Sequence, residues 1–475
     1  MNTITITWIA LPFFLGFVIY LLPQLDRYVS LGVTVISAVY AFQVFVQDSP
    51  LTLELLDNFG VTLLVDQLSA YLILTNALVT AAVILYCWGK QKTAFFYTQA
   101  IILHGSVNAA FICADFISLY VALEVVGIAA FLLISYPRSQ RSIWVALRYL
   151  FVSNTAMLFY LVGAALVYQA NRSFSFAGLS TAPNTAIALI FLGLLTKGGI
   201  FVSGLWLPLT HSESETPVSA MLSGVVVKTG VFALVRCALM VSEVEPIVRI
   251  FGVGTALLGV IYALFEKDTK RTLAFSTVSQ LGWILAAPAV GGVYALGHGL
   301  VKSLLFLIAG NLPSRNFQEL RSQPMNTRIW IPLVIGSLSI SGFPFLVGFG
   351  AKMLTLKNVL PWQEILMNIG AVGTAIVYAK FIFLPHKKEA DIPSGLWLPI
   401  IILTGGIIGG MRIYDDAYTV QNIIKSLGII GIAWFEHFWI FQQSVLTLPR
   451  VLEQFEHLIG FMSLMLLLLL GMILA

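Results

Sequence analysis

Apolar runs long enough to cross a membrane recur along the whole chain. A helix needs about 20 mainly apolar residues to span the hydrocarbon core of a bilayer. Runs of this kind cover residues 3–23, 28–46, 67–89, 93–114, 115–135, 143–168, 184–207, 217–241, 247–265, 271–290, 291–311, 329–351, 363–384 and 395–411. This pattern predicts an all-α polytopic membrane protein with about 14 core transmembrane helices.

Two further apolar segments follow near the C-terminus. Residues 419–443 carry Lys425, Glu436 and His437, so this segment is expected either to span the membrane or to lie along it. Residues 457–475 end in SLMLLLLLGMILA and are expected to span. One or two C-terminal helices are therefore added to the core.

The segment between the second and third apolar runs has a different period. It reads LTLELLDNFGVTLLVDQ, from Leu51 to Gln67. It is polar and alternates between apolar and polar positions, which predicts an external β-hairpin.

The charges of the loops support this division into spans. One set of alternate loops holds Arg27, Lys90, Lys92, Arg138, Arg141, Lys267, Lys270, Arg271, Arg315, Arg321, Arg328, Lys387 and Lys388. The other set holds only Arg172, Arg249, Lys357 and Arg412. Basic loops face the cytoplasm, so the N-terminus is expected outside.

The composition excludes several classes of protein. Hydrophobic residues make up 59% of the chain and charged residues 10%, with a mean hydropathy of +0.92, whereas about a quarter of a soluble domain is charged. The net charge of +4 is too small to suggest nucleic acid as a partner. Cys87, Cys113 and Cys237 lie in apolar runs without close spacing, so no disulfide framework, metal or cofactor is expected.

Five charged residues stand inside the predicted spans. A charge at the centre of a bilayer costs about 2.5–3.5 kcal/mol on insertion scales, so each one needs a physical reason. They are Glu124, Lys197, Lys228, Lys302 and Lys352.

Two structural explanations compete with a transport role for such residues. Lys380, Arg148 and Arg236 lie near the ends of spans, where a long side chain reaches the headgroups or forms an ion pair. Lys197 and Lys228 have about two apolar helical turns on both sides. For these two lysines the sequence favours a role in transport.

Paired with a carboxylate, a buried lysine can work as a proton gate. Low-dielectric surroundings disfavour an ammonium, and a nearby carboxylate restores it. Glu124 and Lys197 are the predicted pair: together they hold the proton, and on separation the lysine releases it. A series of lysines on neighbouring helices can then relay protons across the membrane.

Glycine and proline accompany two of these lysines. Gly198 and Gly199 follow Lys197, and the segment SGFPFLVGFGAK precedes and includes Lys352. Such residues interrupt helices, and interrupted helices at mid-membrane expose backbone groups to water or ions. Two such segments suggest an internal inverted repeat.

The histidines divide into three cases. His298 and Lys302 are four residues apart and share a helix face, so His298 is a relay candidate weighed evenly against a packing role. His104 has no charged partner nearby and is expected to be a packing group. The segment LTHSESETP holds His211 with two glutamates, and it is expected to be a solvated acidic loop, with proton collection as the alternative.

Four stretches carry a family resemblance: WLPLTHSESETPVSAMLSGVVVKTGVFALVR, DTKRTLAFSTVSQLGWI, HGLVKSLLFLIAG and SGFPFLVGFGAK. Together they resemble the antiporter-like subunits, which comprise the large subunits (A and D type) of Mrp-type Na⁺/H⁺ antiporters and the proton-pumping membrane subunits of respiratory and photosynthetic complex I. The resemblance covers about residues 55–385. It implies inverted five-helix repeats with discontinuous helices 7 and 12. It also implies a mid-membrane proton path of Glu124, Lys197, Lys228, His298 or Lys302, and Lys352.

The sequence departs from the family pattern at a few positions. Leu209 replaces the acidic residue that often follows WLP, and Arg148 stands where lysine is common. Lys352 matches the Mrp subunits and some complex I subunits, while one complex I type has glutamate there. The C-terminal region is most similar to cyanobacterial members that are named as D-type complex I subunits but associated with Mrp-type complexes.

The resemblance also implies a division of the single helical membrane domain. The parts are N-terminal helices 1–3 with the hairpin in residues 1–92, a first repeat in 93–241, a second repeat in 242–384 and C-terminal helices in 385–475.

The leading hypothesis is a proton-translocating subunit of an Mrp-type cation/proton antiporter. Its expected transported ions are H⁺ and Na⁺ or a similar cation, and its expected partners are the other membrane subunits of the complex. The alternative is a proton-pumping subunit of an NAD(P)H– or ferredoxin–quinone oxidoreductase. A redox enzyme in its own right is disfavoured, because no glycine-rich dinucleotide fingerprint or cysteine cluster is present. A subunit that supplies proton flux to a non-membrane enzyme, such as an inorganic-carbon uptake module, stays open. A bacterial plasma membrane or a thylakoid membrane is the expected location.

Overall fold

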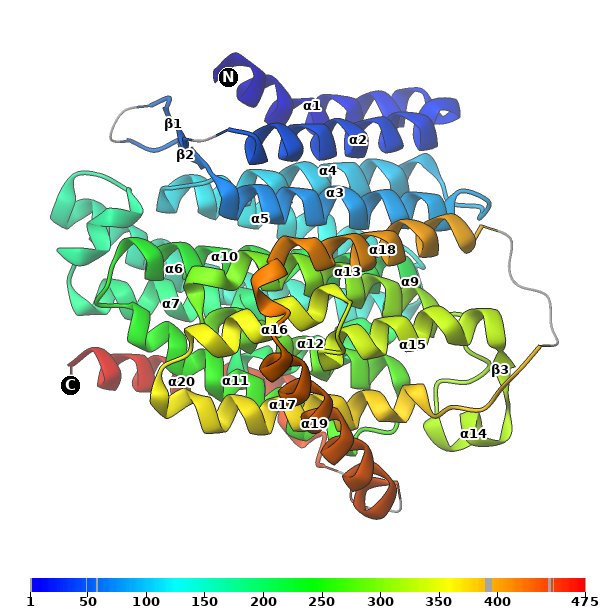
Figure 1. Cartoon of the computed structure of the whole chain (residues 1–475). Helices are drawn as coiled ribbons and strands as arrows, with labels where there is room; N and C mark the ends of the chain where they lie inside the picture. Colours follow the sequence, from blue (N-terminus) through cyan, green and yellow to red (C-terminus); the bar gives the residue numbers. More distant parts are fainter. Residues whose placement is uncertain are drawn as a thin grey trace.

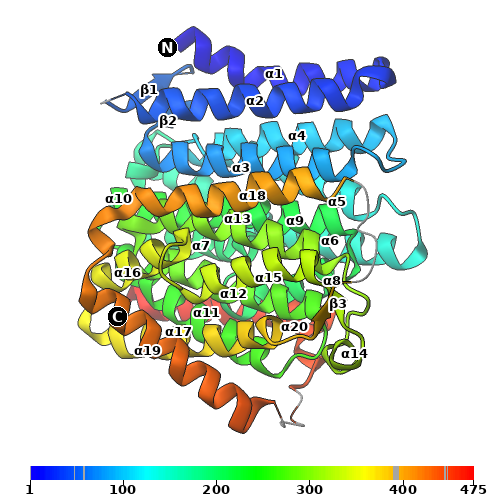
Figure 2. The ribbon, with the colours of Figure 1, turned by 45° about the vertical axis from the view of Figure 1, so that its right-hand side comes forward.

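The computed structural model describes residues 2–47, 49–56, 59–388, 395–442, 446 and 448–474. Most helices lie side by side along one direction in stacked layers (Figures 1 and 2). Within the described residues, 13 helices are long and apolar enough to cross a membrane. The predicted all-α polytopic fold is confirmed.

The N-terminal part lies at one side of the bundle, where α1 and α2 are outermost and α3 and α4 lie beneath them, in dark to light blue in Figure 1. Its elements are α1 (Asn2–Leu21), η1 (Pro23–Leu25), α2 (Asp26–Phe45), β1 (Leu51–Glu54), β2 (Thr62–Val65), α3 (Gln67–Cys87) and α4 (Ala94–Ala110). The two strands pair antiparallel, with Leu51 opposite Val65, so the predicted hairpin is present. Asp66 follows the hairpin and caps α3, because its side chain accepts a hydrogen bond from the Ser69 N–H at 3.0 Å.

The first predicted repeat contains an interrupted span. Its further elements are α5 (Phe116–Ile134), α6 (Gln140–Asn171), η3 (Phe176–Ser180), α7 (Asn184–Gly198), η4 (Phe201–Trp206), α8 (Leu207–Glu213), α9 (Thr216–Met221), the π-helical turn η5 (Leu222–Val226) and α10 (Lys228–Met240). The break after α7 falls at Gly199, whose φ of +69° is a left-handed conformation that glycine adopts without strain. The chain then passes through η4 into α8.

The second predicted repeat is interrupted in the corresponding place. Its elements are α11 (Glu245–Phe265), α12 (Thr269–Ala286), η6 (Pro288–Val290), α13 (Gly291–Ala309), α14 (Phe317–Ser322), β3 (Met325–Asn326), α15 (Thr327–Ser341), α16 (Val347–Asn358), α17 (Pro361–Ile382) and β4 (His386–Lys387). The break between α15 and α16 contains Gly342 with φ +90°. The two breaks fall in the seventh and twelfth predicted runs. Because successive spans alternate in direction, this offset of five reverses the second set relative to the first.

The C-terminal helices pack against both sets. They are α18 (Trp397–Gly409), η7 (Gly410–Ala417), α19 (Val420–Glu436), the π-helical turn η8 (His437–Phe441), η9 (Val451–Glu453) and α20 (Phe455–Leu474). Helix α18 lies along α3 and α13, α19 along α17, and α20 returns to α7 (Figure 1). The segment from Val420 to Phe441 is long and apolar enough to cross a membrane. Residues 443 and 475, the ends of two predicted runs, lie outside the described residues.

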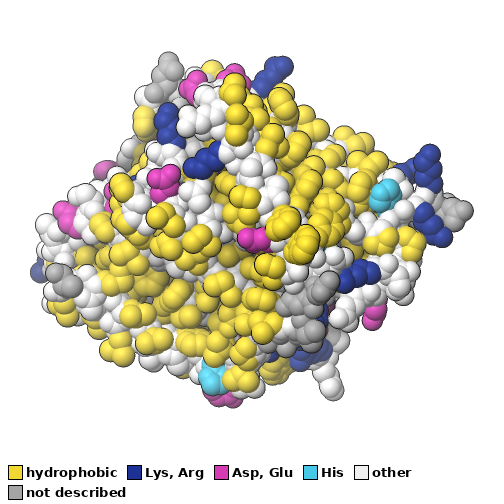
Figure 3. All heavy atoms as spheres, turned by 60° about the horizontal axis from the view of Figure 1, so that its bottom comes forward, with side chains coloured by type: hydrophobic (Ala, Val, Ile, Leu, Met, Phe, Trp, Pro, Cys, Tyr) yellow, Lys and Arg dark blue, Asp and Glu magenta, His cyan; other side chains and the backbone are white. Residues whose placement is uncertain are grey.

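The surface is that of a lipid-embedded protein. Hydrophobic side chains cover much of the face shown in Figure 3, and most charged side chains lie toward its margins. Exposed large apolar residues include Phe14 on α1, Phe151 on α6 and Ile365 on α17. In water such a surface would aggregate, whereas lipid tails accommodate it.

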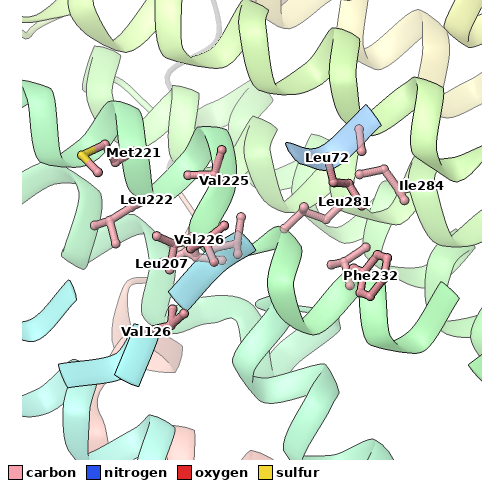
Figure 4. Packing of buried hydrophobic residues seen from close by; sticks show 14 of the residues in the cluster. Leu72, Val126, Leu207, Met221, Leu222, Val225, Val226, Phe232, Leu281 and Ile284 are labelled. Atoms are coloured by element: carbon pink, nitrogen blue, oxygen red, sulfur yellow. The ribbon is translucent and has the colours of Figure 1, made fainter. Parts of the chain in front are cut away.

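The interior between the two sets is apolar and densely packed. Figure 4 shows part of this packing, with Leu72 of α3, Val126 of α5, Leu207 of α8, Phe232 of α10 and Ile284 of α12, all of them buried. This packing keeps bulk water from the charged residues that lie nearby.

Candidate functional site

Lys197 occupies the last turn of α7, directly before the break. Its side chain is 4% exposed, and its Nζ donates a hydrogen bond to the Ser153 Oγ of α6 at 2.6 Å. Because α7 ends at Gly198, the lysine stands at the C-terminal end of a half-helix, where backbone carbonyls favour a cation.

The Lys197 ammonium, which comes from α7, contacts the face of α5 that carries Glu124. A Cβ atom placed on Gly127 would be 2.9 Å from the Lys197 Nζ, and residues three apart share a helix face. The two charges form no ion pair within 4.0 Å among the described residues, and the Glu124 Oε1 is buried there without a hydrogen-bond partner. The predicted pair is therefore adjacent but not closed in this structure.

Lys228 lies at the junction of the π-helical turn η5 and α10. A π-helical turn leaves carbonyl groups without their usual helical donors. The Lys228 Nζ donates to the carbonyl oxygens of Ser223 at 3.0 Å and Gly224 at 2.5 Å. Its side chain is 1% exposed, so the backbone, and not a carboxylate, holds this ammonium.

Lys302 on α13 has two partners from two other helices. Its Nζ donates to the Leu273 carbonyl oxygen of α12 at 2.9 Å and to the Tyr378 hydroxyl of α17 at 2.7 Å. The Tyr378 hydroxyl also lies 2.8 Å from the Ser276 Oγ. None of these contacts was expected from the sequence.

A pair of hydroxyl groups joins the surroundings of Lys228 and Lys302. The Ser223 Oγ lies 2.7 Å from the Thr277 Oγ1, which donates to the Leu273 carbonyl oxygen at 2.9 Å. Ser223 and Leu273 are the residues whose carbonyls hold Lys228 and Lys302, respectively. The two lysines are thus held by one connected hydrogen-bond system.

His298 lies between these lysines and the second interrupted span. Neighbouring Gly299 faces Lys228, because a Cβ there would be 3.6 Å from the lysine Nζ. Both ring nitrogens of His298 are buried without a hydrogen-bond partner among the described residues. The ring lines a cavity of about 10 Å³ together with Ala351, which precedes Lys352. A cavity of this size holds about one water molecule.

Lys352 on α16 faces aromatic side chains. Its Nζ lies 5.1 Å from the ring centre of Trp283 and has no hydrogen-bond partner among the described residues. Trp283 stacks on Tyr294 with ring centres 5.8 Å apart. The Tyr294 hydroxyl donates to the Gln280 Oε1 at 2.5 Å, and both residues line the cavity beside His298.

The other buried histidines differ from the sequence-based expectation in one case. His104 is fully hydrogen-bonded: its Nε2 lies 2.8 Å from the Ser37 Oγ and its Nδ1 3.2 Å from the Thr80 Oγ1, which fits the expected packing role. His211 is not in a solvated loop, and that expectation is wrong. Helix α8 continues past the apolar run and carries His211 into the interior, where it stacks on Phe306 with ring centres 5.0 Å apart.

The two glutamates of this segment are partly exposed. Glu213 pairs with Arg141 at 3.5 Å and Glu215 with Lys92 at 2.6 Å. Both ring nitrogens of His211 are buried without a hydrogen-bond partner among the described residues, as for His298. A helix that continues through the sequence THSE, Thr210 to Glu213, carries His211 into the interior. This continuation was the signal that could have identified His211 as buried.

The cations near span ends have local partners. Lys380 donates to the carbonyl oxygens of Ala263 and Glu266 at the end of α11, at 3.2 and 2.6 Å. Arg236 forms a bidentate pair with Asp66, and Arg148 donates to the carbonyl oxygen of Glu453. Arg236 thus forms the ion pair that the structural explanation named, whereas Lys380 and Arg148 are held by backbone carbonyls.

The described residues contain no group of three or more His, Cys, Asp or Glu side chains arranged to hold a metal ion. The three cysteines are free and buried. What the site offers is a series of buried titratable side chains. The lysines contact a hydroxyl, a backbone carbonyl or an aromatic ring, and His298 lines a small cavity.

Comparison with known proteins gives consistent relatives. Residues 113–377 match the family described as NADH:quinone oxidoreductase/Mrp antiporter, TM. The N-type subunit of the NADH-quinone oxidoreductase of Desulforudis audaxviator is 28% identical, over 77% of this chain and 84% of the relative. The D-type subunit of the Na(+)/H(+) antiporter of Alkalihalophilus pseudofirmus is 26% identical over 85% and 92%. NAD(P)H-quinone oxidoreductase chain 4-2 of Synechocystis is 27% identical over 90% and 88%.

Solved structures share the fold. A chain of the membrane-bound sulfane sulfur reductase, an archaeal respiratory membrane complex, superimposes with a TM-score of 0.78 at 22% identity, over 90% of this chain and 98% of that one. A chain of the Mrp complex from Dietzia gives a TM-score of 0.73 at 22% identity, over 99% of this chain and 55% of that one. These matches confirm the architecture of the predicted family resemblance.

Proposed function

The chain belongs to the NADH:quinone oxidoreductase/Mrp antiporter transmembrane family, and from this premise we propose that it is a proton-translocating subunit of an Mrp-type antiporter that exchanges H⁺ for Na⁺ or a similar cation. The observation that carries the proposal is the series of lysines buried inside the spans, with one carboxylate beside the first. Lys197, Lys228 and Lys352 lie at or near interrupted or π-helical points, and Lys302 lies within α13. Burying several ammonium groups is costly, and structural packing alone does not require them.

In the proposed mechanism Glu124 and Lys197 form the gate. When the carboxylate approaches the ammonium, the proton stays on Lys197; when they separate, as in this structure, the proton is free to leave. Gly127 leaves the space in which the ammonium moves, and Ser153 holds it in the separated position.

The proton then passes along the lysine series. Lys228, His298 and Lys302 act as neighbouring carriers at mid-membrane, and His298, with both nitrogens free of partners among the described residues, transfers protons through water. Lys352 receives the proton through the small cavity beside His298. Helix α16 leads from there toward Lys357, which belongs to the loop set predicted to be external.

Other membrane subunits surround the chain in this proposal, in a bacterial plasma membrane or a thylakoid membrane. The curated relatives are named as subunits of antiporters or of quinone oxidoreductases. A subunit of a proton-pumping quinone oxidoreductase is the second candidate, because the two oxidoreductase relatives are as similar to this chain as the antiporter relative is. Isolation of the intact complex and identification of its chains separates the two candidates.

The proton gate is tested in membrane vesicles. Glu124→Ala and Lys197→Ala should abolish cation-driven proton exchange while leaving assembly intact, and Lys228→Ala should impair it severely. Lys380→Ala is the matched control, since that lysine caps α11 and should lose little exchange. Near-normal exchange by Glu124→Ala and Lys197→Ala at normal protein levels would refute the gate.

A further inference from the structure

Tyr378 and Ser276 stand beside Lys302, in the halves of their helices that are predicted to be cytoplasmic. We propose that their hydroxyl groups form a two-step relay that loads Lys302 with protons from the cytoplasmic side. This inference rests on the proposed function, because it assumes that Lys302 carries protons. It assigns the relay to two residues that the sequence did not single out.

The geometry of the relay is short and dry. The Lys302 Nζ lies 2.7 Å from the Tyr378 hydroxyl, and that hydroxyl lies 2.8 Å from the Ser276 Oγ. All three side chains are buried, and Tyr378 is among the largest fully buried ones. Both separations are in the range of strong hydrogen bonds, so a proton can move along them without rearrangement of the helices.

The two partners of Lys302 suit both of its protonation states. As an ammonium, Lys302 donates one hydrogen to the Leu273 carbonyl oxygen and another to the Tyr378 oxygen. As a neutral amine it still donates to Leu273, while its lone pair accepts from Tyr378. A hydroxyl can fill both roles, because it has one hydrogen and two lone pairs.

The transfer leaves no charge on the relay. The Tyr378 O–H bond breaks as its proton moves to the lone pair of the Lys302 Nζ. At the same time the Tyr378 oxygen takes the Ser276 hydroxyl proton, and the Ser276 oxygen takes one from a water molecule that receives it from the cytoplasm. One positive charge has then moved from the water to Lys302.

The route leads toward the cytoplasm. Tyr378 lies four residues before the end of α17, about 6 Å at the rise of an α-helix. Lys302 and Ser276 lie equally deep, seven residues from the end of α13 and from the start of α12, which is about 10 Å. Both helix ends adjoin loops of the strongly basic set. Thr272, four residues before Ser276, shares its face of α12, and its hydroxyl lies 3.4 Å from the Glu266 carbonyl oxygen.

A cavity opens on the neighbouring face of α12. It has a volume of about 310 Å³ and is lined by residues including Glu266, Arg450 and Phe275, which directly precedes Ser276. Neither Thr272 nor Ser276 lines this vestibule, so in this proposal a water molecule carries the proton from it to their hydroxyls.

The other hydrogen-bond link of Lys302 is not an alternative relay. The hydroxyls of Ser223 and Thr277 connect it toward Lys228, but both ends of that link are backbone carbonyls. A carbonyl oxygen accepts a hydrogen bond and has no proton to pass on. That link positions the two lysines.

The experiment measures proton flux in vesicles that contain the intact complex. Tyr378→Phe and Ser276→Ala each remove one hydroxyl and should lower the flux by about ten- to a hundredfold, since positioned proton transfer contributes about that much or more. Two matched controls remove hydroxyls that donate to backbone carbonyls elsewhere: Tyr160→Phe, bound to Phe116, and Ser279→Ala, bound to Ala256. Both controls should keep normal flux.

Two further readouts separate a relay from a packing role. Tyr378→His restores a group that carries a proton and should recover part of the flux, whereas Tyr378→Phe, which packs better, should not. The residual flux of Tyr378→Phe should also show a solvent isotope effect different from that of the unmodified complex. Control-like flux in both Tyr378→Phe and Ser276→Ala would overturn the relay; if Tyr378→Phe fails to assemble, Ser276→Ala decides.

The outcomes also separate this inference from the proposed function. Loss of exchange in Lys197→Ala with full flux in Tyr378→Phe and Ser276→Ala would remove the relay and keep the gate. Normal exchange in Lys197→Ala and Glu124→Ala would remove the proposed function itself.

Discussion

The space beside Gly127 offers a direct test of whether the position of the Lys197 ammonium controls transport. Replacing Gly127 with alanine would place a methyl group 2.9 Å from the Lys197 Nζ and 3.9 Å from the Ser153 Oγ. The Nζ itself lies 2.6 Å from that Oγ. These three separations describe a triangle with nearly a right angle at the Nζ.

The expected displacement follows from this geometry. The ammonium must withdraw by roughly 0.5 Å to reach an ordinary contact distance. Because the withdrawal is perpendicular to the hydrogen bond with Ser153, that bond hardly lengthens and the folded state loses little. Alanine is also favoured over glycine in a helix by about 0.8–1.0 kcal/mol. Thermal stability should therefore stay equal or rise.

Transport should fall in spite of this. A misplacement of about 1 Å in a reacting group can cost about a hundredfold in rate, so about half of that should cost about tenfold. The assay is cation-driven proton exchange in inverted vesicles, normalised to the amount of assembled complex.

Gly32→Ala on α2 is the matched control. It makes the same chemical change at a helical position, and a Cβ there meets no atom within 4 Å. If Gly127→Ala exchanges protons as fast as Gly32→Ala does, the location of the Lys197 ammonium against α5 is irrelevant and the gate must be abandoned.

Three further predictions concern the charged groups at the ends of the helices. Asp66→Asn should destabilise the protein by about 3–5 kcal/mol, because it leaves the buried Arg236 guanidinium without its ion pair; a thermal-unfolding midpoint in detergent equal to that of the unmodified protein would contradict this. Burial raises the pKa of Glu266, but the Arg271 guanidinium, the Asp268 N–H and the Arg450 guanidinium together lower it more, so the pKa lies below its ordinary value of about 4.3. The stability that this ion pair contributes should be complete above the ordinary pKa and be lost as the pH falls through the lower pKa of the folded protein. Unfolding midpoints measured between about pH 3 and 6 would check this. A Glu266→Gln variant should lose this part of the pH dependence. Lys380→Ala should lower the unfolding midpoint slightly through lost hydrogen bonds to carbonyls of α11, and a severe loss of proton exchange by a stable Lys380→Ala protein would show that this lysine belongs to the path.

Local patterns predicted much of the fold. The hairpin after α2 followed from the alternation between Leu51 and Gln67, and the helices followed from apolar runs. The glycines at 199 and 342 marked the two breaks, because their left-handed conformations require that residue. The end of the first interrupted span was missed: the polar residues around His211 lowered the hydropathy although the helix continues there as α8.

The hydropathy and the charge pattern of the chain by themselves determined that this is a polytopic membrane protein, where its spans lie and which charges stand inside them. Only the tertiary structure decided what each buried charge touches. Lys302 meets Tyr378 across 76 positions of sequence, and His104 meets Ser37 across 67. Hydropathy is a property of neighbours along the chain, whereas the hydrogen-bond partners of a buried group come from whichever helices pack against it. Packing therefore decided that the His104 ring has hydrogen-bond partners and that the rings of His211 and His298 have none among the described residues.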